Sequence, residues 1–192
     1  MSVFENLVIE NKNQIIDNRW IEWHHALIPT EPEWLRKLVR ILLFNLGHCL
    51  PCTSLSGCYF ALHKMPPQPL HPNCDCKKLH LDYNEVRKAQ ADMPLEKITN
   101  YIFGEKFKEN GKQDIFINLG FNKNNAELLK RTFEIQAREN YIKGNYNLKQ
   151  LDNFGQRLAI PIVLNDKKFL SGWMVYPKGK IKNTTPFGGW IK

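Results

Sequence analysis

Two closely spaced cysteine pairs constrain this chain more than any other feature of its sequence. Two residues separate Cys49 from Cys52, one residue separates Cys74 from Cys76, and 21 residues lie between the pairs. Zinc prefers four thiolate or imidazole ligands in a tetrahedron, and two short-spaced pairs joined by a loop provide that arrangement with little strain. We therefore predict a structural Zn²⁺ site whose ligands are Cys49, Cys52, Cys74 and Cys76.

The loop between the pairs leaves alternatives open. His71 lies close enough to Cys74 in the sequence to replace one of the thiolates. The further candidate ligands are His48, Cys58 and His63. The cysteines can instead be free thiols or a redox disulfide, although tight clustering in a reducing compartment favours a metal. Residues 48–80 contain few large apolar residues, so a bound ion would supply much of the local folding free energy.

The positive charge of the chain is concentrated near its C-terminal end. The formal net charge is +8, and residues 143–192 alone carry nine Lys or Arg against two Asp. Such a surface either keeps a protein soluble or binds a polyanion, which can be nucleic acid or an acidic protein.

The sequence shows no signal for a membrane. No apolar run approaches the roughly 18 residues that a membrane-spanning helix needs. The first residues have neither the basic start nor the long apolar core of a secretory signal. We therefore expect a cytoplasmic protein without a membrane partner.

Hydrophobic periodicity predicts helices first and strands later. Residues 30–33 form a capping box, and apolar residues then recur at helical spacing up to Gly47. Residues 48–80 are predicted to be turn-rich, and residues 81–93 to hold a short polar helix. We place a domain boundary near Asp92, which divides the chain into regions 1–92 and 93–192.

The second region changes its period part-way. Three apolar stripes at helical spacing occupy residues 94–140, and Gly104 and Gly120 end the first two. The predicted strands cover residues 146–151, 158–164, 169–176, 180–184 and 189–192, with a hairpin turn at 177–180. The whole pattern predicts an α+β fold, with an N-terminal helical and zinc-knot region followed by helices packed on a C-terminal antiparallel β-sheet.

The cysteine segment resembles a known signature. The runs CLPC at 49–52, MPP at 65–67 and HPNCDC at 71–76 resemble the C-terminal motif of phage Mu F-type minor head proteins, over residues 48–78. This chain departs from the motif at Asp75, where that family usually has Arg. The resemblance implies a toxin domain directly after the motif, because head proteins of this type are known to carry one there.

A second resemblance covers residues 94–192. The runs PLEKITNY at 94–101, SGWMVYP at 171–177 and TTPFGG at 184–189 resemble the C-terminal domains of bacterial polymorphic toxins. Those domains are similar to the nuclease fold of barnase, EndoU, colicin-type tRNases and RelE. The resemblance implies a metal-independent ribonuclease that acts on tRNA or other RNA, and an acidic immunity protein as its partner.

The resemblance also suggests site residues, although no histidine follows His80 to serve as acid or base. The expected catalytic residues are Lys112, Tyr176 and Thr185. Lys180 and Lys182 are expected to hold phosphates, and Trp173 to stack on a base. Each has a simpler alternative: Trp173 as a core residue, Tyr176 and Lys112 as surface residues, and residues 184–186 as a turn.

Two other functions stay open at this point. The chain can be a non-enzymatic protein of phage head morphogenesis, which uses its basic sheet for protein or DNA contacts. It can also be a zinc-stabilised nucleic-acid-binding module without chemistry.

Overall fold

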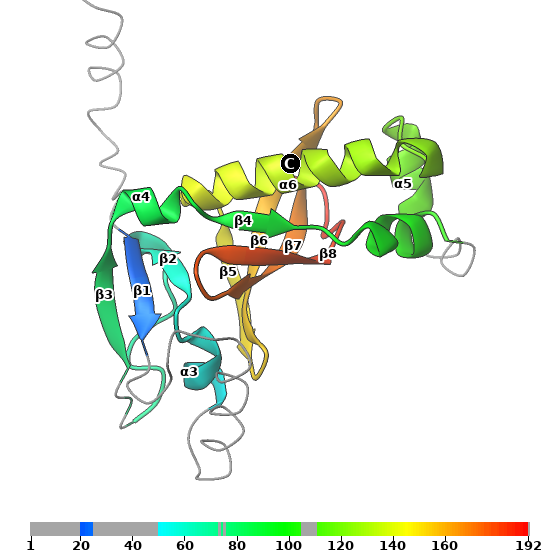
Figure 1. The fold of residues 1–192 in the computed structure, drawn as a ribbon. Coiled ribbons are helices and arrows are strands. Elements are labelled where there is room, and N and C mark those ends of the chain that lie inside the picture. The colour runs from blue at the N-terminus through cyan, green and yellow to red at the C-terminus, as the bar shows by residue number, and fades with distance from the viewer. Residues whose placement is uncertain (1–19, 25–49, 73, 75, 105–110, 192) are drawn as a thin grey trace, which may run out of the picture.

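A computed structural model of the chain describes residues 20–24, 50–72, 74, 76–104 and 111–191. It has the expected α+β fold, with helices packed against β-sheets (Figure 1). The helix predicted after residue 30 and the predicted ligand Cys49 lie outside the described residues. Among the described residues, no helix has the length and apolar character needed to cross a lipid bilayer.

The larger sheet has five strands in the order β4-β8-β7-β6-β5. Their bounds are β4 (Gln90–Asp92), β5 (Asn147–Asp152), β6 (Gly155–Leu164), β7 (Lys167–Tyr176) and β8 (Lys180–Thr185). β5 to β8 form the predicted antiparallel meander, whereas β4 pairs parallel with β8 at the edge. In place of the predicted strand at 189–192, Trp190 makes a single bridge to Phe169.

Helix α6 (Ala126–Ile142) covers one face of this sheet. Its buried residues Leu129, Phe133 and Ala137 recur every fourth position, which places them on one side of the helix. Phe133 lies 6.0 Å from Phe169 of β7, measured between ring centroids. Leu128, predicted in the same stripe, is 58% exposed.

Polar side chains of α6 also complete the edge of β6. β5 pairs with β6 only as far as Ala159, so the backbone beyond that residue needs other partners. Gln136 both donates to and accepts from the backbone of Val163, at 2.7 Å each. Asn140 donates to the Pro161 carbonyl at 2.8 Å. The helix therefore replaces a missing strand at this edge.

The remaining helices of the second region lie at one end of α6 (Figure 1). They are the π-helix η2 (Lys97–Ile102), α5 (Lys112–Asn118) and the 3-10 helix η4 (Lys123–Asn125). Gly104 follows η2 as predicted, and a Cβ at this position would collide with the Asn100 carbonyl. These elements correspond to the first two predicted apolar stripes and to the entry into the third.

A smaller sheet lies at the opposite end of α6, and its strands were not predicted. It has the order β2-β1-β3, all antiparallel, with β1 (Trp20–His24), β2 (Tyr59–Ala61) and β3 (Lys77–Leu81). The segment predicted to be turn-rich also contains α3 (Leu50–Leu55) and η1 (Leu62–Lys64). The polar helix predicted at 81–93 is reduced to α4 (Tyr83–Val86), and β4 follows it.

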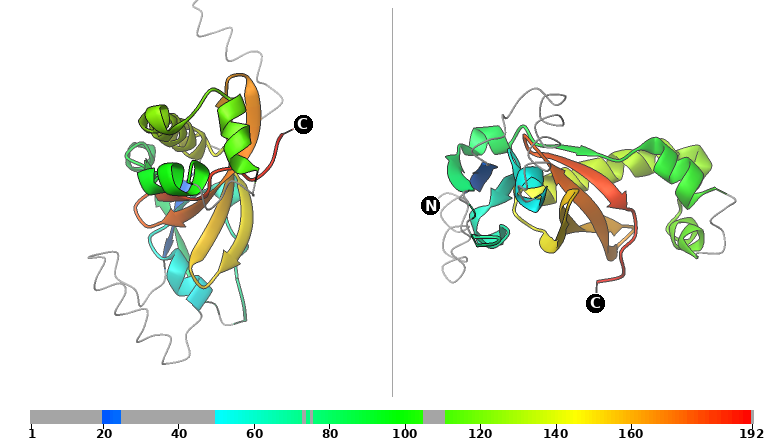
Figure 2. Two further views of the ribbon diagram at one scale, coloured as in Figure 1. Left: turned by 90° about the vertical axis from the view of Figure 1, so that its right-hand side faces the viewer. Right: turned by 90° about the horizontal axis from the view of Figure 1, so that it is seen from below.

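One hydrophobic core runs through both sheets. It includes Trp23 and Phe60 of the small sheet as well as Phe133 and Ile160 of the larger part. Figure 2 shows α3 beside the β5–β6 hairpin, where the two parts meet. The division near residue 92 stays a prediction; it falls directly after β4, whose residues belong to the larger sheet.

Candidate metal centre and polar face of the sheet

Three potential metal ligands converge where α3 meets the loop that precedes β3. Cys52 lies on α3 and is buried, whereas His71 and Cys74 come from the loop and are partly buried. A backbone hydrogen bond of 3.2 Å from the Cys74 N–H to the His71 carbonyl folds the loop so that both side chains turn to the same side. The cluster can hold a metal ion, because its ligand atoms all lie within 4.8 Å of one another.

The distance between the two sulfurs of this cluster suits tetrahedral coordination. The sulfurs of Cys52 and Cys74 are 3.7 Å apart, and the Cys52 sulfur is 3.1 Å from His71 Nε2. Two metal–sulfur bonds of about 2.3 Å at the tetrahedral angle would place their sulfurs about 3.8 Å apart. The sulfur pair thus already has the separation that a shared ion would require.

The His71 ring is oriented for coordination through Nε2. Its Nδ1 lies 2.7 Å from the Pro72 carbonyl, which can only accept a hydrogen bond, so Nδ1 carries the proton. In the neutral ring Nε2 then has the free lone pair, and it faces Cys52. Metal-binding histidines are commonly held in this way by a carbonyl behind the ring.

The two thiols of the loop, Cys74 and Cys76, have different pKa values. Burial raises the pKa of Cys74, but hydrogen bonds from the backbone at Leu70 and Cys76 outweigh it, so this pKa lies below its usual value. Burial raises the pKa of Cys76 to about 11, against the lowering effects of Trp23 and Cys52. Gln68 donates to the Cys76 carbonyl and ties this residue to the loop. Cys76 therefore adjoins the cluster as a buried neighbour.

Of the four predicted ligands, Cys52 and Cys74 lie in this cluster, Cys76 is not one of its members, and Cys49 lies outside the described residues. His71, predicted as a replacement for a cysteine, joins the cluster together with Cys74. Cys58, a further candidate, is fully buried elsewhere, where its thiol faces the carbonyls of Ser54 and Val175.

A second group of predicted site residues shares one face of the larger sheet. In the antiparallel register Tyr176 is opposite Lys180, and Gly172 is opposite Thr185. Met174 is opposite both Lys182 of β8 and Arg157 of β6. Residues that face each other across antiparallel strands project to the same side. We call Arg157, Tyr176, Lys180, Lys182 and Thr185 the polar face.

The polar face is the one that α6 does not cover, because Phe169, which contacts α6, projects to the other side. Tyr176 is 40% exposed, and Lys180 and Lys182 are exposed at alternate positions of β8. Two acids border the face: Asp92 lies 3.7 Å from Lys182, and Asp152 lies 3.1 Å from Arg157. The face is therefore accessible and carries three cations with two acids at its margins.

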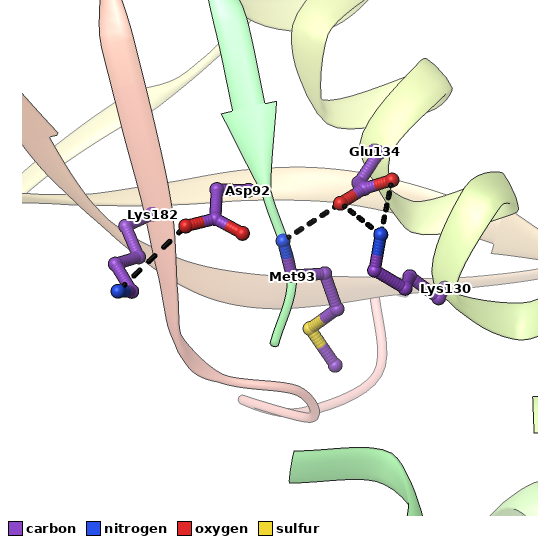
Figure 3. A network of polar contacts seen from close by, with 5 residues as sticks. All are labelled: Asp92, Met93, Lys130, Glu134 and Lys182. Carbon is purple, nitrogen blue, oxygen red and sulfur yellow. Dashed lines mark hydrogen bonds and ion pairs between the residues drawn. The ribbon is translucent and has the colours of Figure 1, made fainter. Parts of the chain in front are cut away.

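Strand β4 is held between this face and α6. Figure 3 shows Asp92 directed toward Lys182, while the backbone N–H of the next residue, Met93, points to Glu134 of α6. That hydrogen bond is 3.1 Å long, and Lys130 pairs with the same carboxylate at 3.0 Å. The edge strand thus joins the polar face to the helical layer.

Two of the predicted site residues lie elsewhere. Trp173 projects into the core and is completely buried, so its ring cannot stack on a base in this structure; it is a core residue. The Lys112 ammonium donates to the Tyr101 hydroxyl at 2.9 Å, and this pair joins α5 to η2. Lys112 therefore belongs to the helical end of the molecule and is not one of the strand residues of the polar face.

The sequence reasoning missed two cations near these strands. Arg157 falls one residue before the predicted strand 158–164, where extending the alternation would have placed it on the solvent side. Lys97 of η2 donates to the carbonyls of Asn183 and Thr184 at 2.6 and 2.9 Å. Burial and the neighbouring Lys182 lower the pKa of Lys97. No local pattern could have predicted the contact of Lys97, because η2 and β8 are distant in the sequence.

Comparisons of the chain with protein-family models, curated proteins and solved structures find no match. The Cys52–His71–Cys74 cluster and the polar face are therefore the observations from which we propose a function. The cluster could hold a metal ion, and the polar face is exposed and carries three cations.

Proposed function

We propose that this protein is a zinc-stabilised ribonuclease of the toxin type, which binds RNA on the polar face of its larger sheet. The observation that carries the proposal is the register of β6, β7 and β8, which gathers three cations, a phenol and a hydroxyl on one accessible face. A polyanion is the ligand that such a face attracts, and an acidic immunity protein would compete for it.

The side chains of the polar face suit RNA cleavage without a catalytic metal. Such cleavage needs a group that takes the proton of the 2′-hydroxyl, a group that protonates the leaving oxygen, and cations for the phosphate. Tyr176 takes the proton of the 2′-hydroxyl through its phenol oxygen, and the ammonium of Lys180, directly across the strand pair, gives a proton to the leaving oxygen. Lys182 and Arg157 bind the phosphate, and the Thr185 hydroxyl donates a hydrogen bond to it.

Zinc is the ion that fits the Cys52–His71–Cys74 ligand set best. Thiolates are soft ligands and imidazole is borderline, and together in a tetrahedron they favour Zn²⁺ over the harder Mg²⁺ and Ca²⁺. With four protein ligands no position would be open for substrate, so the ion would have a structural role. Elemental analysis of the purified protein should give about one zinc per chain; a protein purified without metal and unable to take up zinc would contradict this part.

Ribonuclease activity is tested with purified zinc-loaded protein and tRNA or total RNA, in a buffer without added Mg²⁺. We expect cleavage that leaves a 2′,3′-cyclic phosphate. Tyr176→Phe should lower the rate about 10²- to 10⁴-fold, the usual contribution of a proton-transferring group. Tyr83→Phe is the matched control, because Tyr83 is also an exposed tyrosine but lies on α4.

RNA binding is tested separately by its salt dependence. Lys182→Ala should weaken binding and reduce the slope of log affinity against log salt by about 1, as expected for one lost phosphate contact. Lys88→Ala is the control, because Lys88 is also an exposed lysine paired with an acid, Glu85, but is not one of the residues of the polar face. Salt-dependent binding without cleavage would reduce the function to a nucleic-acid-binding module. Binding that Lys182→Ala leaves unchanged would contradict the proposed face.

A further inference from the structure

Trp23 of β1 is a buried tryptophan whose indole N–H makes no well-formed hydrogen bond. Its side chain has no exposed surface. Buried tryptophans usually pair this group, because a donor left unpaired away from water is unfavourable. The indole therefore requires an explanation.

The sulfur of Cys76 adjoins this indole. Cys76 is only 6% exposed, and its sulfur interacts with the Trp23 side chain and with the sulfurs of Cys52 and Cys74. The antiparallel pairing of Trp23 with Lys78 and of His24 with Lys77 fixes β1 beside the residue that precedes β3. Backbone pairing therefore places Trp23 beside the segment that carries Cys76.

A neutral thiol is a weak hydrogen-bond acceptor, whereas a thiolate is a strong one. A cysteine that binds a metal is present as the thiolate. We infer that Cys76 is the fourth ligand of the metal, beside Cys52, His71 and Cys74, and that the Trp23 indole N–H donates a hydrogen bond to its sulfur. This inference rests on the proposed metal site and assigns β1 a part in it.

The inferred hydrogen bond would make Trp23 a positioning residue of the metal centre. Partners of this kind orient the ligand and tune its basicity, and their loss typically weakens metal binding 10- to 100-fold. The centre would then join three segments of the chain: β1, α3 and the loop of residues 68–76.

The experiment compares Trp23→Phe with Trp173→Phe. Both tryptophans are fully buried, and both have an indole N–H without a partner, but Trp173 belongs to the core side of β7. Zinc affinity is measured by competition with a chromophoric chelator, and the ligand set by the absorption spectrum of the Co²⁺ form. We expect Trp23→Phe to weaken zinc binding 10- to 100-fold and Trp173→Phe to leave it unchanged. In a Cys76→Ala background, Trp23→Phe should have no further effect.

The inference would be overturned by wild-type zinc affinity in Trp23→Phe, by an equal loss in Trp173→Phe, or by a Co²⁺ spectrum that Cys76→Ala does not change. A wild-type protein that binds no zinc would instead refute the metal site itself. NMR of the unmutated protein tests the inference without any variant, and so also applies if a variant fails to fold. Zinc addition should shift the indole N–H resonance of Trp23 and slow its exchange, without doing so for Trp173.

Discussion

Cys76 shows how strongly the protein interior acts on a single side chain. Burial holds its pKa at about 11, against an ordinary value of 9.0, so the thiol of the metal-free protein stays neutral where a thiol in water would ionise. As the inferred fourth ligand, Cys76 would have to release this proton to bind zinc, and metal affinity should therefore rise with pH. The neighbouring Cys74, whose pKa lies below its usual value, loses its proton more readily.

The raised pKa of Cys76 predicts alkaline sensitivity of the metal-free protein. Between about pH 9 and pH 11 the thiol ionises in the unfolded chain but not in the folded one. The contribution of Cys76 to the free energy of unfolding is thus constant below pH 9 and falls as pH rises toward 11, by about 1–3 kcal/mol. Urea unfolding at a series of pH values in chelator measures this. Cys76→Ser, which does not titrate there, should lose that share of the decline; an identical decline in both proteins would refute the assignment.

Among the elements, the turn between β7 and β8 contacts several separate parts of the fold. Lys178 and Gly179 have φ of 61° and 68°, as a two-residue hairpin turn requires. The Lys178 N–H donates to the Gly57 carbonyl after α3, at 2.8 Å, and the Gln90 N–H donates to the Gly179 carbonyl at 3.1 Å. The turn thereby links the segment after α3, the strand β4 and the polar face.

Gly179→Ala should therefore destabilise the protein more than the left-handed backbone alone explains. A Cβ at this position would lie 3.0 Å from Tyr59 and 3.2 Å from Ala89. Backbone strain of about 1 kcal/mol and this close approach together predict a loss of about 2–3 kcal/mol. Gly111→Ala is the control, because Gly111 has φ of 63° and nothing within 4 Å of the added carbon. Its cost should be about 1 kcal/mol in urea unfolding, and equal losses would show that the Tyr59 contact relaxes freely.

At the scale of the whole molecule, the candidate metal centre and the strands that carry the polar face share one core. Cys52 and Leu55 of α3 are buried in the same cluster as Val175 and Ile181 of the larger sheet. Cys58, shortly after α3, bridges to Pro177 at the end of β7. A change at the metal centre can thus reach the strands that carry Tyr176 and Lys180.

Metal removal should consequently loosen more than the cysteine loop. An ion that binds only the folded chain stabilises it in proportion to the logarithm of its concentration over its dissociation constant. Chelation should lower the melting temperature and speed hydrogen exchange at the Lys178 amide, whose acceptor is Gly57. Amides in the middle of α6, such as that of Phe133, should change less. Faster exchange confined to residues 68–76 would show that the centre stabilises only its own loop.

The sequence by itself determined the α+β class, the strands β5 to β8, the turn at 177–180 and three of the candidate ligands, Cys52, His71 and Cys74. These features depend on local signals: period-two burial, turn-forming residues and short cysteine spacings, all of which act between neighbours in the chain. Strand alternation places Trp173 and Tyr176 on opposite sides of β7, although both were predicted as residues of one site; only Tyr176 is exposed.

Only the tertiary structure decided which side of that strand is buried, because α6 covers the side of Trp173. It also decided the small sheet: β2 is buried throughout and β3 is exposed at four of five positions, so neither alternates, and both strands form by pairing with the distant β1. Tertiary packing also placed His71 beside Cys52 and Trp23 beside Cys76. Contacts between segments far apart in the chain depend on packing, and no local pattern encodes packing.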